Sequence, residues 1–250
     1  MRHFYFLFSC FIISLLLPNA LHAANQLHVC TVATHNDPGL FRLQRSCQRK
    51  GVPLVVLGQG RPYPSNGIKL QFVKEYLDTL PDDDILLFID GFDVIILDDG
   101  QTILEKFLSK NTPFFISKEM NFGPAFSRDL IANYPNAPTN FQFINSGGYI
   151  GYVKFIKQLF DSLSFQINID DQDQIHVHFL KNRDKYCLDY FCDIFLSLYD
   201  VKWSDLLVDC QQSKILLLPT NTKPSIIHGN GPNDSSSKRI LGELSSAFGI

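Results

Sequence analysis

The sequence predicts an α/β domain with a largely parallel central sheet, and three observations point to it. Short runs of β-branched and large apolar residues alternate with segments whose apolar residues recur every three or four positions, as in successive strand–helix units. The length of 250 residues and the 45% hydrophobic content suit one domain with a sizeable core. The apolar run at 85–89 ends in an acid, as expected where an internal strand carries a ligand-binding residue at its carboxyl end.

The first half of the chain supplies the alternating elements. Strands are expected at 27–34, 53–58, 85–89 and 113–119, and helices at 41–50, 68–80 and 101–110. Composition and pattern also predict a Gly- and Pro-containing loop at 59–67, a helix-like segment at 153–163, and a Ser-rich surface turn at 233–238. This order favours right-handed crossovers with ligands bound beyond the strand ends.

The N-terminus has the pattern of a secretory signal peptide over 1–23. A short basic start, an apolar run and then a helix breaker with small residues follow one another, with cleavage expected after Ala23. The apolar run is short for a bilayer span of roughly 20 residues, and an uncleaved signal anchor is the alternative. We therefore expect the rest of the chain in the lumen of the secretory pathway, in a periplasm or outside the cell, without stable membrane insertion.

Charge and cysteine content narrow the function classes. The net charge of −3, without a long basic run, makes nucleic acid an unexpected partner. The chain holds six cysteines but no CxxC pair, so a zinc cluster is not expected. An oxidising compartment would permit one or two disulfides, and the sequence leaves open whether Cys187 pairs with Cys192 or Cys30 with Cys47.

Two acids follow the expected strand at 85–89. Asp90 and Asp93 are three positions apart, and Gly91 between them lets the backbone turn tightly. Carboxylates in this arrangement can hold one divalent ion, directly or through water, and hard oxygen ligands suit Mg²⁺ or Mn²⁺. A solvated turn with capping acids is the alternative.

A histidine near the C-terminus could complete that ion site. His228 follows an apolar, strand-like pair and precedes the turn Gly229-Asn230-Gly231-Pro232. An imidazole suits a borderline ion such as Mn²⁺, and the amides of a glycine-rich turn can hold a phosphate. The alternative is an ordinary turn after an edge strand.

Two further stretches carry polar groups. Asn145 and Ser146 precede two glycines that would let a ligand approach the backbone, unless they form a plain turn. The acids at 170–173 could bind acceptor hydroxyls or act as a general base, unless they form a helix N-terminus. His176 and His178 would share a strand face and are expected to be structural or surface residues.

Taken together, these stretches predict chemistry on a sugar nucleotide. An ion held by two Asp and one His would neutralise a pyrophosphate, and glycine-rich turns would surround it. This is the electrostatic requirement for expelling a nucleoside diphosphate from a sugar.

Five strings in this order resemble the glycosyltransferase domain of procollagen lysyl hydroxylases and, more distantly, the collagen galactosyltransferases. They are T-V-A-T (31–34), F-I-D-x-x-D-V-I (88–95), I-N-S-G-G-Y-I-G (144–151), D-D-Q (170–172) and I-H-G-N-G-P (227–232). The resemblance runs from about Val29 to Pro232, and the N-S-G-G-Y-I-G and H-G-N-G-P strings are its most specific parts. The dioxygenase domain of those hydroxylases is not expected, because the chain ends at Ile250.

The resemblance implies a single GT-A-like, Rossmann-like domain over 24–250 that uses Mn²⁺ and a UDP-sugar. The implied ion ligands are Asp90, Asp93 and His228. The implied nucleotide and diphosphate contacts are Val32, Ala33, Thr34, Lys69, Asp90, Gly91, Phe92, Gly229, Asn230, Gly231 and Pro232. The residues implied at the sugar and acceptor, assigned as catalytic, are Glu119, Asn145, Asp171 and Asp173.

The chain also departs from that family. The family has a tryptophan-bearing loop after the glutamate, whereas this chain reads K-E-M-N-F-G-P-A-F at 118–126, with Phe122 as the nearest aromatic residue. The acceptor side is therefore expected to differ. The D-D-Q register is open as well, because 170–172 keeps the spacing from N-S-G-G while 173–175 agrees better with the family in the residues after it, so Asp171 and Asp173 are kept together.

We therefore expect an exported, Mn²⁺-dependent glycosyltransferase. It would move glucose or galactose from a UDP-sugar to a hydroxyl of a protein or glycan, such as hydroxylysine or galactosyl-hydroxylysine of a collagen-like protein. The alternatives are a metal-dependent UDP-sugar hydrolase and a non-catalytic glycan- or collagen-binding module on the same fold. Retention and inversion of the anomeric centre are both compatible with these residues.

Overall fold

The computed structural model describes residues 25–123, 128–163 and 165–250. The predicted signal peptide at 1–23 lies outside these residues. In the part of the chain that the structure describes, no helix is long and apolar enough to cross a membrane.

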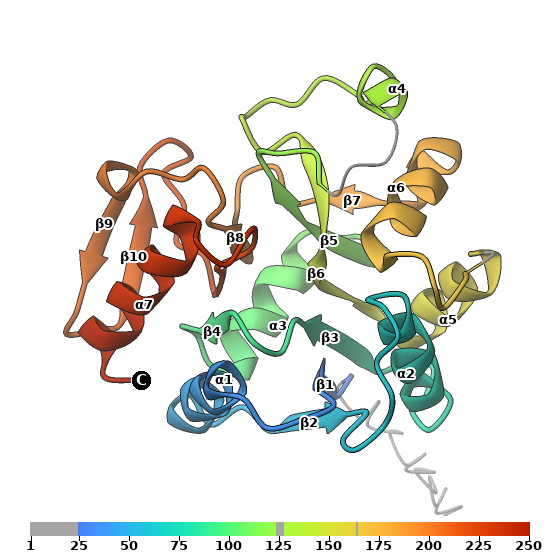
Figure 1. Ribbon diagram of the computed structural model, residues 1–250, viewed down its shortest axis with the longest axis horizontal. Coiled ribbons are helices and arrows are strands. Elements are labelled where there is room, and N and C mark those ends of the chain that lie inside the picture. Colours follow the sequence, from blue (N-terminus) through green and yellow to red (C-terminus); the bar gives the residue numbers. More distant parts are fainter. Residues whose placement is uncertain (1–24, 124–127, 164) are drawn as a thin grey trace, which may run out of the picture.

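A six-stranded sheet forms the centre of the molecule, in the order β2-β1-β3-β6-β5-β7 (Figure 1). Its strands are β1 (Leu27–Val32), β2 (Leu54–Leu57), β3 (Ile85–Ile89), β5 (Phe114–Glu119), β6 (Phe143–Tyr152) and β7 (Cys187–Leu188). The β1–β2, β1–β3 and β5–β7 pairs are parallel, whereas β6 runs antiparallel to both of its neighbours. The predicted α/β fold with a mostly parallel sheet is confirmed.

Helices cover both faces of this sheet. The helices of the described residues are α1 (Pro38–Arg49), α2 (Ile68–Leu77), α3 (Gly100–Ser109), α4 (Arg128–Ile131), α5 (Val153–Ser162), α6 (Asp171–Lys181) and α7 (Ser236–Phe248). Helices α2, α5 and α6 pack on one face and α1 and α3 on the other (Figure 1). Strand β3 is buried along its whole length, with alternate side chains in the two clusters, which explains its unbroken apolar run.

A smaller sheet lies beside the main one, in the order β4-β11-β8. Its strands are β4 (Val94–Ile96), β11 (Ile226–His228) and β8 (Phe195–Ser197), and a ribbon of β9 (Leu206–Asp209) and β10 (Lys214–Leu217) packs nearby with α7. Single 3₁₀ turns occur at Arg183–Lys185 and Trp203–Asp205. Strand β11 is the central strand of its sheet and not an edge strand, so His228 is held from both sides.

The elements expected in the first half of the chain all form, with ends shifted by a few residues. Helix α1 starts three residues earlier than expected, at Pro38, because the Asp37 side chain accepts a hydrogen bond from Gly39 N and caps the helix. The expected surface turn at 233–238 is wrong in its second half, where α7 begins. The alternative of a plain turn at 145–148 is wrong too, since these residues lie within β6.

Two further expectations are corrected. His176 and His178 lie on helix α6 and therefore do not share a strand face. The cysteines of the described residues are all free, so neither pairing forms. Cys30 and Cys47 belong to the apolar clusters on opposite faces of the central sheet, which keeps them apart.

Candidate active site

The two predicted acids lie in the connection between β3 and β4, and the predicted histidine at the end of β11 meets them beyond the end of β3. Asp90 directly follows β3, and its backbone N–H donates to Gly147 O of β6 at 2.9 Å. Asp93 directly precedes β4, which pairs with β11 so that Val94 lies opposite His228. Gly229 N then donates to Asp93 O at 2.8 Å and closes this corner.

Three potential ligand atoms converge there. The ligand atoms of Asp90, Asp93 and His228 all lie within 4.8 Å of one another. His228 Nε2 is 3.3 Å from Asp93 Oδ1 and 3.7 Å from Asp90 Oδ2. Two carboxylate oxygens and one imidazole nitrogen form a donor set that suits Mn²⁺ or Mg²⁺, so the residues fit a divalent cation. Their role as ligands stays a prediction.

Glycine at position 147 is required for this convergence. A Cβ there would lie 2.3 Å from His228 Cε1 and 2.7 Å from Asp90 Oδ2, closer than real Cβ contacts come. The glycine pair of β6 therefore serves the close approach of side chains to the strand backbone.

Each carboxylate also forms an ion pair with a lysine through its outer oxygen, the one that does not face His228. Lys69 Nζ lies 3.0 Å from Asp90 Oδ1, and Lys238 Nζ lies 2.5 Å from Asp93 Oδ2. Burial opposes ionisation of Asp93, but His228 and Lys238 outweigh it and hold the pKa of Asp93 below its usual range. Burial likewise acts against the charge of Lys69, but Asp171 and Asp90 raise its pKa well above the ordinary value. The lysines thus leave the inner oxygens facing His228.

Asn145 sets the orientation of His228. Its Nδ2 donates to Glu119 Oε1 at 3.0 Å, so its Oδ1 faces His228 Nδ1 at 3.1 Å and accepts the Nδ1–H. A neutral imidazole in this tautomer directs the lone pair of Nε2 toward the two carboxylates, as a metal ligand requires. Burial acts to lower the pKa of His228, but the neighbouring Asp93 and Asp90 outweigh it and raise that pKa.

Glu119 holds three side chains near the site in place through hydrogen bonds. Its buried carboxylate accepts hydrogen bonds from the side-chain amides of Asn145 (3.0 Å), Gln172 (2.8 Å) and Asn230 (2.7 Å). Burial raises the pKa of Glu119 to about 7, while these three donors favour its charged form. Glu119 therefore positions other side chains, a role that the sequence did not separate from contact with substrate.

A cavity of about 700 Å³ opens beside the three converging residues. It is lined by Val32, Asp37, Arg42, Tyr63, Asn66, Lys69, Asp90, Gly91, Phe92, Asp93, Asn233 and Lys238. Half of this lining was predicted for the nucleotide and the ion. The volume lies within the usual range of ligand pockets, roughly 300–1,000 Å³.

Other predicted contacts lie outside the cavity lining. They are Ala33, Thr34 and the turn residues Gly229, Asn230, Gly231 and Pro232. The amide of Gly229 is already bonded to Asp93 O, and the side chain of Asn230 bonds Glu119 and Tyr199 N. These groups hold the site together in the structure, and their contact with a nucleotide stays a prediction.

Four lining residues carry charge or an aromatic hydroxyl that the sequence did not reveal, and one of them is Asp37, which caps α1. Arg42 donates from Nη2 to Phe92 O at 2.9 Å, Tyr63 donates to Asn66 Oδ1 at 2.8 Å, and Lys238 reaches in from α7. The signal for Lys238 was a basic residue shortly after the glycine-rich turn, but the Ser-rich patch around it predicts a surface turn.

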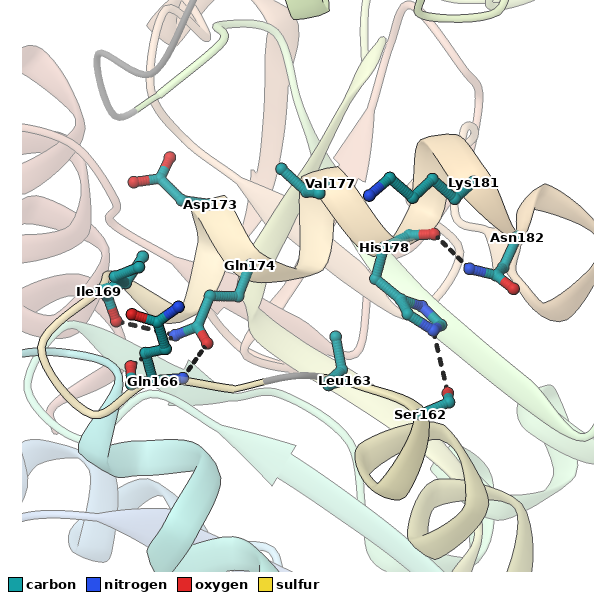
Figure 2. A pocket seen from close by; sticks show the side chains of 10 residues that line it. All are labelled: Ser162, Leu163, Gln166, Ile169, Asp173, Gln174, Val177, His178, Lys181 and Asn182. Carbon is teal, nitrogen blue, oxygen red and sulfur yellow. Dashed lines mark hydrogen bonds between the residues drawn. The ribbon is translucent and has the colours of Figure 1, made fainter.

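The structure separates Asp171 from Asp173. Asp171 Oδ2 lies 3.0 Å from Nζ of Lys69, which lines the cavity of about 700 Å³. Burial raises the pKa of Asp171 to about 6, although Lys69 opposes this. Asp173 lines a different cavity of about 320 Å³, between α6 and the α5–α6 connection (Figure 2). Asp170 caps α6 and Gln172 reaches Glu119, so the D-D-Q at 170–172 is the register that meets the site.

The segment at 118–126, where the chain departs from the family, is described only in part. Phe122, the aromatic residue nearest to Glu119 in the sequence, packs against the rings of Tyr134, Phe143 and His176. Residues 124–126 of the departing loop lie outside the described residues. Phe122, the aromatic residue of this segment that the structure describes, therefore packs against the apolar core.

Comparison with known proteins adds a family and a fold. A model of the PLOD GT domain matches residues 23–245. The chain is 27% identical to the uncharacterized protein R699 of Acanthamoeba polyphaga mimivirus, over 87% of this chain and 48% of that protein. It is 28% identical to the human multifunctional procollagen lysine hydroxylase and glycosyltransferase LH3, over 88% of this chain and 33% of that protein. The chain thus spans half or less of these relatives.

A solved structure shows the same fold. The crystal structure of a glycosyltransferase involved in the glycosylation of the major capsid of PBCV-1 superposes with a TM-score of 0.50 at 10% identity. The match covers 90% of this chain and 100% of that chain. At this identity the likeness concerns the fold alone, and it confirms the GT-A-like fold.

Proposed function

The chain belongs to the family of PLOD glycosyltransferase domains, and on that premise we propose that it is a cation-dependent glycosyltransferase with a UDP-sugar as donor. The proposed cation is Mn²⁺, and the proposed sugar is glucose or galactose. The observation that carries the proposal is the convergence of Asp90, Asp93 and His228 at the edge of a cavity large enough for a nucleotide.

The charges around the cavity support a diphosphate ligand. Asp37, Asp90 and Asp93 are balanced by Arg42, Lys69 and Lys238, so the lining is close to neutral. A bound divalent cation would make it positive by two charges, which is what an anionic diphosphate needs. When bound, the cation would also act as a Lewis acid for the charge that develops on the leaving UDP.

The chain's own residues would orient the donor. Lys69, fixed between Asp90 and Asp171, is placed to hold the diphosphate from the α2 side. Asp171 Oδ1 is buried and has no hydrogen-bond partner among the described residues. Because buried polar groups are normally paired, this oxygen is suited to accept a hydrogen bond from a sugar hydroxyl.

The acceptor and the location are part of the same proposal. We propose transfer to a hydroxyl of a protein or glycan. The human relative is named as both a procollagen lysine hydroxylase and a glycosyltransferase, which supports hydroxylysine of a collagen-like protein as the first acceptor to test. The signal-peptide pattern at 1–23 supports an exported location.

The test measures UDP release by the purified protein from UDP-glucose and UDP-galactose, with and without Mn²⁺ and a hydroxylysine-containing peptide. We expect release that requires Mn²⁺, rises with the peptide and is lost in Asp90→Ala and His228→Ala. Lys181→Met, in the separate cavity of Figure 2, is the matched control and should keep full activity.

Each rival function has its own outcome. Full activity in both site variants would refute the cation assignment. Release that ignores every acceptor, with free sugar as the product, would identify a UDP-sugar hydrolase. UDP binding without any release would identify a non-catalytic module.

A further inference from the structure

We propose that Lys238 couples binding of the cation to binding of the diphosphate. Its ammonium opposes the cation while no nucleotide is present, and it assists the cation once a diphosphate is bound. The inference rests on the proposed function, because it needs both ligands to share the cavity. It assigns a task to a residue that the motifs around Asp90 and His228 do not include.

The starting observation is how the two carboxylates divide their oxygens. The inner oxygens, Asp90 Oδ2 and Asp93 Oδ1, face His228 Nε2 at 3.7 and 3.3 Å. The outer oxygens are held by Lys69 at 3.0 Å and by Lys238 at 2.5 Å. In this state each acid is already neutralised by an ammonium, so a cation arriving alone meets little net negative charge and two nearby positive groups.

The two lysines differ in their freedom. Lys69 has a side chain 9% exposed and contacts both Asp90 and Asp171 at 3.0 Å. Lys238 has a side chain 25% exposed, and among the described residues its ammonium is paired with Asp93 alone. Lys238 can therefore turn toward a second anion at a small cost, whereas Lys69 is fixed.

The backbone that carries Lys238 is anchored, so its motion is confined to the side chain. Ser237 Oγ donates to Asn230 O at 2.5 Å and ties the first turn of α7 to the glycine-rich turn. Gly229 N in turn donates to Asp93 O at 2.8 Å. The flexible stem of Lys238 thus swings from a point that is fixed relative to Asp93. Lys238 also lines the cavity of about 700 Å³ that is proposed to hold the UDP-sugar, called the donor cavity below.

The ammonium of Lys238 therefore has opposite effects on cation binding in the absence and in the presence of a diphosphate. An ammonium within about 5 Å of a divalent ion at a partly buried site weakens cation binding by roughly tenfold or more. A diphosphate supplies negative charge that both the ammonium and the cation can share, which removes that repulsion. Cation and nucleotide therefore strengthen each other, and the factor is the same in whichever order they bind.

The experiment measures the four dissociation constants that connect the free protein with its Mn²⁺, UDP and doubly bound states. Mn²⁺ binding is followed by electron paramagnetic resonance and UDP binding by calorimetry. In the wild type, UDP should tighten Mn²⁺ binding about 100-fold, within the usual range of coupling between sites. In Lys238→Met, Mn²⁺ alone should bind about tenfold tighter, UDP with Mn²⁺ present should bind more weakly, and the coupling factor should fall at least about tenfold.

Two further variants and a matched control complete the design. Lys238→Gln should repeat the result of Lys238→Met, and Lys238→Arg should keep most of the coupling because it keeps the charge. Lys74→Met removes a lysine–aspartate pair of the same length on the surface, Lys74 to Asp161 at 2.5 Å, and should leave all four constants unchanged. Circular dichroism and thermal unfolding establish that each variant is folded.

The outcomes are separable. If Lys238→Met and Lys238→Gln weaken both ligands with an unchanged coupling factor, or change nothing, the proposal is overturned while the proposed function stands. If the wild type binds neither Mn²⁺ nor UDP, the proposed function fails and this inference fails with it.

Discussion

Two cavities among the described residues differ in how their polar groups are paired. In the cavity between α6 and the α5–α6 connection, Gln174 bonds the backbone of Gln166 and of Ile169, and His178 bonds Ser162 Oγ (Figure 2). His178 also bonds the Tyr186 hydroxyl. These side chains hold a loop in place. In the donor cavity the polar groups are instead charged: Asp90 and Asp93 converge with His228 and pair with Lys69 and Lys238.

The comparison teaches that converging charged side chains from distant segments distinguish the candidate site, whereas the other cavity is bordered by side chains that bond a loop. Helix α6 shows this in a single turn. Asp171 and Asp173 are two positions apart, so their side chains point about 200° apart around the helix axis. Asp171 reaches Lys69 at the donor cavity, while Asp173 lines the other cavity.

The largest expected effect comes from adding a methyl group at Gly147, where Asp90 and His228 approach the backbone of β6. Gly147→Ala places a Cβ against His228 Cε1 and Asp90 Oδ2, so at least one of these side chains must move. We expect Mn²⁺ affinity to fall by about 100-fold, because ligand geometry tolerates little displacement. Mn²⁺ binding followed by electron paramagnetic resonance measures this.

The matched control is Gly242→Ala on α7, where an added Cβ meets nothing within 4 Å. It should leave Mn²⁺ binding intact and raise the free energy of unfolding by about 0.5–1 kcal/mol, as expected for glycine in a helix interior. Unchanged Mn²⁺ affinity in Gly147→Ala would contradict the proposal that the cation binds at Asp90, Asp93 and His228.

An intermediate effect is expected from Asn145→Leu, which keeps the size of the side chain but removes its amide. His228 Nδ1 and Glu119 Oε1 then lose a partner, and the imidazole is no longer fixed in the tautomer that presents Nε2. Mn²⁺ affinity should fall by about 10-fold or more, as for other residues that orient a metal ligand.

The control for Asn145→Leu is Asn182→Leu at the other cavity, where Asn182 Nδ2 donates to His178 O at 3.0 Å. Titration with Mn²⁺ should give the wild-type affinity for this variant. An equal loss in both variants would mean that the effect of Asn145→Leu is a general loss of structure.

The smallest effect on ligand binding should come from His178→Phe. This variant removes the hydrogen bonds to Ser162 and Tyr186 and leaves a buried hydroxyl without its partner. We expect unchanged Mn²⁺ and UDP binding, and a free energy of unfolding lower by about 1–2 kcal/mol near pH 7. Urea denaturation measures the difference.

The pH dependence of that difference has a defined sign. Burial lowers the pKa of His178, so the unfolded chain binds more protons than the native one as the pH falls through the ordinary histidine range near about 6.5. The stability that neutral His178 contributes is thus present above that range and lost below it. The difference in the free energy of unfolding between wild type and His178→Phe should decrease from about pH 7 to about pH 5. An increase in this difference would contradict the account.

The sequence predicts the first half of the fold well because its elements are local. Strand β3 carries five consecutive apolar residues and both neighbouring helices have a clear apolar period, so tertiary context does not override them. The ion site was predicted for a related reason. Acids at the end of an internal strand have to face a ligand or solvent, and the structure brings Asp90 and Asp93 together with His228.

The features that the sequence missed depend on packing between distant segments. Lys238 enters the site because α7 starts against the turn at Asn230, which no local pattern encodes. The segment around His176 alternates like a strand, but the Asp170 cap and the acids of the first turn make it a helix. That helix is what separates Asp171 from Asp173.

The most direct test of the account is a crystal of the protein with Mn²⁺ and UDP, examined by anomalous scattering at the manganese edge. The account predicts one strong peak within about 2.0–2.5 Å of Asp90 Oδ2, Asp93 Oδ1 and His228 Nε2, on the side of the donor cavity. A bound UDP with the manganese peak elsewhere, or with no peak at these residues, would contradict it.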